Sequence, residues 1–209
     1  MIIEEADQDG DVFYDSTEYA PGEYEKLIEE ATQFKSRGNQ HFGQGEYKEA
    51  IEQYEHALVV CPLACTKERA VYFANIAACH MKLNEFKDAK DMCTQALKID
   101  PNYTKALLRR AQASERIGTY ASMSEALEDY KKLKTLAIDT YIFKECERAE
   151  KELPTKINFQ MEKEKEEMLN KLKDVGNALL GKFGLSTDNF QFTKDPSGSG
   201  GYSVNFVNK

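Results

Sequence analysis

The most constraining feature of the sequence is a pattern of small and aromatic residues that returns about every 34 residues. The first two copies each end shortly after a proline, Pro62 and Pro101, which cannot continue a helical hydrogen-bond ladder. A period of this length is typical of a helix–turn–helix unit. Since such a unit buries its apolar face only against its neighbours, the pattern predicts an all-α solenoid.

Three copies of the pattern can be aligned, at residues 31–64, 70–103 and 104–140, within a domain of residues 26–140. The small residues expected at helix–helix contacts are Gly38, Ala77 and Ala111 on the leading helices, and Ala50, Ala89 and Ala126 on the second helices. Cys65 to Arg69 form an insertion between the first two copies, which we expect to lengthen a loop or the next helix. Surplus residues around Thr119–Ser122 predict a longer turn inside the third copy. The pattern resembles the tetratricopeptide repeat.

The net charge of −8 comes from the N-terminus alone. Residues 1–25 hold nine acidic residues and no basic ones, which leaves 27 acids against 28 bases in the rest of the chain. We expect residues 1–25 to form a disordered acidic tail. Asp7, Asp9, Asp11 and Glu18 resemble part of a calcium-binding loop. Val12, however, stands where such a loop has a glycine, so a solvated tail is the better interpretation. The near-neutral remainder argues against nucleic-acid binding.

The C-terminal part leaves the repeat pattern. Residues 141–183 predict a short helix that Pro154 ends and a second helix to about Leu180. Met168, Leu172, Val175 and Leu179 lie at spacings of four, three and four, so we expect Met168–Phe183 to cap the array. Dimerisation or a membrane-surface role is the alternative. Residues 184–209 predict an extended tail or a β-hairpin. No apolar run approaches the roughly 20 residues of a membrane span.

Five polar residues stand at matching depths on the leading helices of the three repeats. They are Lys35, Asn39, Asn75, Lys105 and Arg109. Two pairs are four residues apart and therefore share a helix face. Because the leading helices of stacked repeats line a concave groove, all five can converge on one ligand. Ammonium, guanidinium and amide groups together suit a peptide's C-terminal carboxylates.

This set resembles the carboxylate-clamp domains of co-chaperones, with Lys-x-x-Gly-Asn in the first repeat and Lys-x-x-x-Arg in the third. The resemblance implies binding of the Glu-Glu-Val-Asp tails of the seventy- and ninety-kilodalton heat-shock chaperones, with Lys82 as a secondary peptide contact. The segments starting at Leu172, Phe183 and Tyr202 are similar to the tetratricopeptide repeat protein 1 family, over residues 26–209. A cytoplasmic co-chaperone or adaptor is therefore expected.

Other functions have weaker support. The alternative is a scaffold that binds a signalling protein, such as a GTPase, independently of the clamp. It stays open because lysines and arginines on exposed helix faces are often only solvated, without binding a ligand. Cys61 and Cys65 lack a second pair of zinc ligands nearby, and the five scattered cysteines indicate reduced cytosolic thiols. No phosphate loop or catalytic set is present, so we expect no enzyme activity, no cofactor and no metal.

Overall fold

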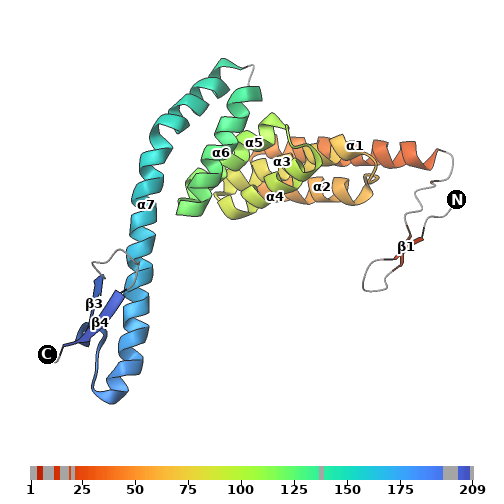
Figure 1. Ribbon diagram of the computed structural model, residues 1–209. Coiled ribbons are helices and arrows are strands. Elements are labelled where there is room, and N and C mark those ends of the chain that lie inside the picture. The colour runs from red at the N-terminus through yellow and green to blue at the C-terminus, as the bar shows by residue number, and fades with distance from the viewer. Residues whose placement is uncertain are drawn as a thin grey trace. The chain divides into compact units, whose positions relative to one another are not determined.

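A computed structural model of the chain describes residues 4–6, 12–14, 19, 22–136, 139–194 and 202–207. The chain divides into two compact units, residues 1–151 and 152–209, and each is described by itself. In the first unit, helices stack as three antiparallel pairs (Figure 1), which confirms the predicted all-α solenoid. The pairs are α1 (Glu23–Gln44) with α2 (Tyr47–Val60), α3 (Thr66–Leu83) with α4 (Phe86–Ile99), and α5 (Thr104–Ile117) with α6 (Tyr120–Leu136).

Small residues allow the close packing within each pair. The alanines predicted at the helix contacts are fully buried: Ala50, Ala77, Ala89, Ala111 and Ala126. At Gly38, an added Cβ would lie only 2.7 Å from Cε1 of Tyr54, so the ring of Tyr54 on α2 rests directly on the backbone of α1. The sequence therefore correctly predicted which positions bring the two helices of a repeat together.

The turn of the third repeat differs from the prediction. All three pairs are joined by two-residue turns, Gly45–Glu46, Asn84–Glu85 and Gly118–Thr119. The prediction of a longer turn is therefore wrong, and the surplus residues extend the start of α6. Thr119 and Ser122 explain this early start, because the backbone N–H of each donates to the side-chain oxygen of the other, at 3.0 and 3.2 Å. Such reciprocal bonds satisfy the first N–H groups of a helix.

The other insertion falls within the expected alternatives. Helix α3 begins at Thr66 with Cys65 as its N-cap, so the inserted residues Thr66–Arg69 lengthen a helix rather than a loop. Arg69 then fixes the junction, since its Nη1 donates to the carbonyl oxygens of Leu58 at 2.6 Å and Cys61 at 2.9 Å. These bonds satisfy carbonyls at the end of α2 that have no partner inside the helix.

Helix α7 (Thr140–Leu180) is continuous through Pro154, so the predicted break at that residue is wrong. Pro154 is exposed, and α7 continues past it at the cost of the one backbone hydrogen bond that proline cannot donate. The first turns of α7 belong to the first unit. There Cys146 and Ala149 are fully buried, and Arg148 pairs with Glu115 at 3.0 Å. The burial predicted for Met168–Phe183 is found instead in these first turns.

The second unit consists of the rest of α7 and the tail. Strands β3 (Phe190–Lys194) and β4 (Tyr202–Phe206) pair antiparallel, with Phe190 opposite Phe206, which corresponds to the hairpin among the two alternatives expected for the tail. The tail is anchored on α7, because the backbone N–H of Thr187 donates to Oδ1 of Asn177 at 2.7 Å. Within the described ranges, none of the helices combines the length and apolar composition that a membrane crossing requires.

The N-terminus also departs from the expectation of a wholly disordered tail. Strands β1 (Glu4–Ala6) and β2 (Val12–Tyr14) form a short antiparallel hairpin, and α1 already begins at Glu23. Valine, phenylalanine and tyrosine at residues 12–14 favour extended structure, which outweighs the acidic composition there. Most of the remaining residues of the predicted tail lie outside the described ranges.

Candidate functional site

The residues predicted to form the binding site all lie on the leading helices of the three pairs. Helix α1 carries Lys35 and Asn39, α3 carries Asn75 and Lys82, and α5 carries Lys105 and Arg109. Helices α3 and α5 contact each other directly, so the second and third repeats bring these helices side by side. Two of the six residues, Asn39 and Arg109, form side-chain hydrogen bonds with other described residues.

Asn39 is held by a tyrosine from the second helix of its own repeat. The hydroxyl of Tyr54 donates to Oδ1 of Asn39 at 2.7 Å, and the ring of Tyr54 lies against Gly38. Burial is the largest cause that raises the pKa of Tyr54, to about 12, so the hydroxyl keeps its proton and donates. Since Oδ1 accepts this bond, the amide NH₂ of Asn39 remains available as a donor to a ligand.

Arg109 lies at the junction of the second and third repeats. Its Nη1 donates to the backbone carbonyl oxygen of Ala74 at 2.9 Å, directly before Asn75. The guanidinium is close enough to Tyr54 and Cys79 that its positive charge opposes the burial that raises both pKa values. Tyr54 therefore connects the surroundings of Asn39 on α1 with those of Arg109 on α5.

The neighbouring arginine, Arg110, differs from Arg109 in its partners. Arg110 donates from Nε and Nη2 to the two carboxylate oxygens of Asp129, both at 2.7 Å. No carboxylate of the described ranges pairs with Arg109, whose side chain is half-buried. A half-buried guanidinium with most of its donors unused is suited to binding an anion from another molecule.

The other four predicted residues are placed but not engaged. Asn75 and Lys35 are half-buried, while Lys82 and Lys105 are exposed. The side chains of these four residues form no hydrogen bond and no ion pair with any other residue that the structure describes. Their convergence on one ligand, together with Asn39 and Arg109, stays a prediction.

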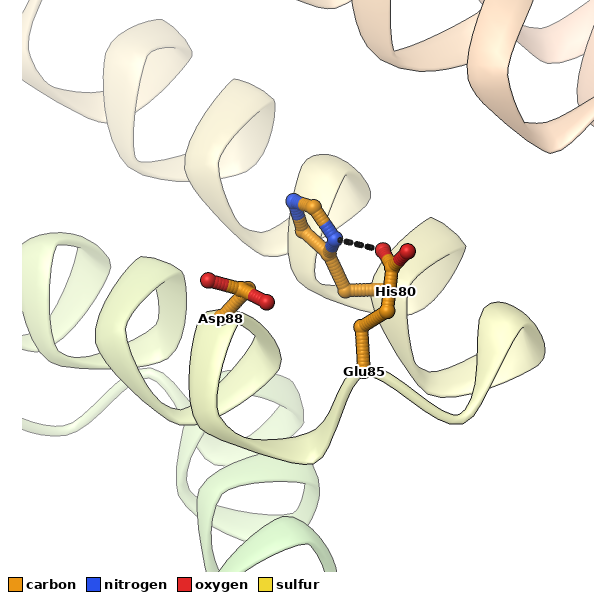
Figure 2. A group of neighbouring side chains, drawn as sticks. All are labelled: His80, Glu85 and Asp88. Carbon is orange, nitrogen blue, oxygen red and sulfur yellow. Dashed lines mark hydrogen bonds and ion pairs between the residues drawn. The ribbon is translucent and has the colours of Figure 1, made fainter.

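One cluster was not anticipated from the sequence. His80, Glu85 and Asp88 each offer a ligand atom within 4.8 Å of the others (Figure 2), and Nδ1 of His80 bonds to Oε2 of Glu85 at 2.7 Å. The first repeat has the same pair, His41 with Glu46, at 2.6 Å. Each pair joins the end of a leading helix to the residue before the next helix. We therefore interpret it as an interaction that stabilises the turn between the two helices of a repeat. A histidine and a glutamate five residues apart in both repeats was the available signal.

The cysteines belong to the buried core. All five are free and buried. Cys61 and Cys65, the candidate zinc ligands, lie in a core cluster with Tyr72, and burial first of all raises the pKa of Cys61 to about 11. Zinc binds thiolates, so a protonated thiol in an apolar cluster opposes zinc binding.

Comparison with known proteins agrees with this architecture. Residues 70–103 match the family model of the tetratricopeptide repeat. The mitochondrial import receptor subunit TOM70 of Rattus norvegicus is 34% identical over 102 residues, which cover 49% of this chain and 16% of that protein. The chain thus corresponds to a small part of the length of this relative.

Two solved structures are similar to more than half of the chain. The first TPR of Spaghetti (RPAP3) bound to HSP90 peptide SRMEEVD is 27% identical, with a TM-score of 0.53, and the match covers 61% of this chain and 98% of that one. The second TPR domain of human RPAP3 in complex with HSP70 peptide SGPTIEEVD is 25% identical, with a TM-score of 0.50, covering 60% and 97%. The stacked helix pairs therefore have the fold of a tetratricopeptide repeat solenoid, with the second pair matching the repeat model itself.

Proposed function

We propose that this chain is a non-catalytic adaptor whose repeat domain binds the acidic C-terminal peptide of heat-shock chaperones. Tetratricopeptide repeat domains are protein-interaction modules, and the two similar domains above were solved with peptides that end in Glu-Glu-Val-Asp. In this proposal, Lys35, Asn39, Asn75, Lys105 and Arg109 hold the terminal aspartate, and Lys82 contacts the upstream peptide. The buried, reduced thiols suit work in the cytoplasm.

The observation that carries the proposal is the unpaired guanidinium of Arg109. It is fixed by the Ala74 carbonyl at 2.9 Å, so little side-chain freedom is lost when a ligand binds. The NH₂ of Asn39, oriented by Tyr54, adds a donor without repelling the nearby cations. A C-terminal aspartate supplies two carboxylates for these groups, and each charge-assisted bond contributes about 1.5–3 kcal/mol.

The proposal is tested by comparing two forms of one peptide. A Met-Glu-Glu-Val-Asp peptide with a free C-terminus should bind in calorimetry with micromolar affinity, roughly −8 kcal/mol. The same peptide with a C-terminal amide has lost one of the two carboxylates and should bind at least about tenfold more weakly. Equal affinities, or no binding at millimolar peptide, would leave the scaffold alternative, in which other partners are held independently of these residues.

Tyr54 gives a second test, because it acts through Asn39 rather than on the peptide. Replacing Tyr54 with phenylalanine keeps the ring against Gly38 but removes the hydroxyl that holds Oδ1 of Asn39. We expect peptide affinity to fall about three- to tenfold, the effect of one net hydrogen bond. The matched control is Tyr72→Phe, which removes another buried hydroxyl in a different cluster and should leave affinity unchanged. Equal losses in both variants would contradict the role given to Tyr54.

A further inference from the structure

The second half of α7 carries an apolar stripe that the fold leaves uncovered. Met168, Leu172, Val175 and Leu179 are 71, 67, 59 and 60% exposed, and we call these four residues the distal seam. Their spacings of four, three and four keep them on one side of the helix, and Met161 extends the stripe by a further seven residues. Apolar residues at alternating spacings of three and four are typical of a helix that packs lengthwise on another helix.

The tail of the second unit lies along one edge of the distal seam, where Leu172 lines a hollow together with Thr187 and Phe190. Thr187 bonds to Asn177 at 2.7 Å, and its Cγ2 lies where a Cβ on Gly176 would be, at 2.9 Å. Lys173 and Asp188 form an ion pair at 3.4 Å along the same flank. These contacts fix the tail on a neighbouring side of α7, and all four residues of the distal seam stay more than half exposed with the tail in place.

The charges along this helix favour a second copy of the same helix as the partner. Residues 162–167 comprise four glutamates and two lysines, whereas residues 171–182 contain three lysines and one aspartate. Two copies placed antiparallel bring the acidic part of one toward the basic part of the other, whereas a parallel pair brings like charges together. A membrane surface fits less well, because interfacial helices carry mainly lysine and arginine on their polar face.

We propose that the distal seam is a self-association surface, through which two copies of this chain pair their α7 helices antiparallel. Pairing removes the four exposed side chains of each copy from water, which is the main favourable contribution to such contacts. The surface shares no residue with the proposed peptide site, so either proposal can fail without the other.

Sedimentation equilibrium on the full chain tests the association. The unaltered chain should approach twice its 23.8 kDa mass as concentration rises. Leu172→Glu places a charge in the distal seam of both copies and should weaken association at least about 100-fold. Phe159→Glu is the matched control: Phe159 is 72% exposed on α7 but stands about two and a half turns before Met168, on the opposite side. It should leave association unchanged.

Cysteine cross-linking tests the orientation. A mixture of Met161→Cys and Leu179→Cys chains should form a disulfide-linked dimer, while Met161→Cys alone should not, and the five native cysteines are buried. Circular dichroism checks that each variant keeps its helices. A chain that stays monomeric at several hundred micromolar, an equal loss with Phe159→Glu, or cross-linking of Met161→Cys to itself would overturn the proposal. So would a monomer that binds vesicles of anionic lipid through the distal seam.

Discussion

Replacing Arg109 with alanine should weaken binding of the Met-Glu-Glu-Val-Asp peptide by about 30- to 150-fold, with little loss of stability. The guanidinium makes one bond within the protein, to the Ala74 carbonyl, and no ion pair with any carboxylate in the described ranges. Its remaining donors are free for a ligand. The loss of a charge-assisted contact, about 2–3 kcal/mol, gives this range of affinities. Calorimetry measures the affinity, and urea denaturation measures the stability.

The control for Arg109 is another cation on the repeat domain. Lys87 is exposed on α4, a second helix of its pair, so it should not face a ligand held by α1, α3 and α5. Lys87→Ala should change affinity by less than about twofold, the effect of a distant screened charge. If Arg109→Ala and Lys87→Ala bind the peptide equally well, the assignment of Arg109 to an anion site is wrong.

The repeat architecture could be predicted because its determinants are local and periodic. Gly38 and the alanines at its counterpart positions are small for one reason, the approach of two helices, and that reason recurs in every repeat. The candidate site residues could be predicted for the same reason, because a position on the leading helix of one repeat indicates the equivalent position on the next. What remained hidden depended on contacts between elements.

Tyr54 illustrates what the pattern does not contain. The sequence indicates that Tyr54 fills space beside Gly38, but not that its hydroxyl reaches Asn39, fifteen residues away on the facing helix. Likewise, the four-residue spacing from Lys105 selects Arg109, but it does not reveal that the adjacent Arg110 is paired inside the fold. Their difference arises from α6, which presents Asp129 to only one of them.

The two errors in helix boundaries have a common physical origin. Proline signals the end of a helix because it cannot donate one backbone hydrogen bond, but α7 tolerates that single loss at Pro154. The start of α6 is set by the paired bonds of Thr119 and Ser122, which a count of surplus residues cannot reveal. In both places, a single local interaction decided between a loop and a helix.

Replacing Asp129 with alanine should have the opposite profile to Arg109→Ala: a loss of about 3 kcal/mol in the free energy of unfolding. The residue is 6% exposed, and it accepts two bonds from Arg110, whose pKa this hydrogen bonding holds above its ordinary value. Without Asp129, the guanidinium stays half-buried, and the side-chain bond that it keeps among the described residues is the one to Oγ1 of Thr94, at 3.5 Å. An uncompensated buried charge costs about 3–5 kcal/mol, and partial exposure of Arg110 favours the lower end.

Urea denaturation followed by circular dichroism measures this loss, with Glu128→Ala as the control. Glu128 forms an exposed pair with Lys131 on the same helix, and such pairs contribute less than about 1 kcal/mol. Combining Arg110→Met with Asp129→Leu removes both charges and should restore most of the stability, because apolar residues can replace a buried ion pair. A loss below about 1 kcal/mol for Asp129→Ala would mean that Arg110 is solvated. The contrast between an arginine paired inside the fold and an arginine left for a ligand would then disappear.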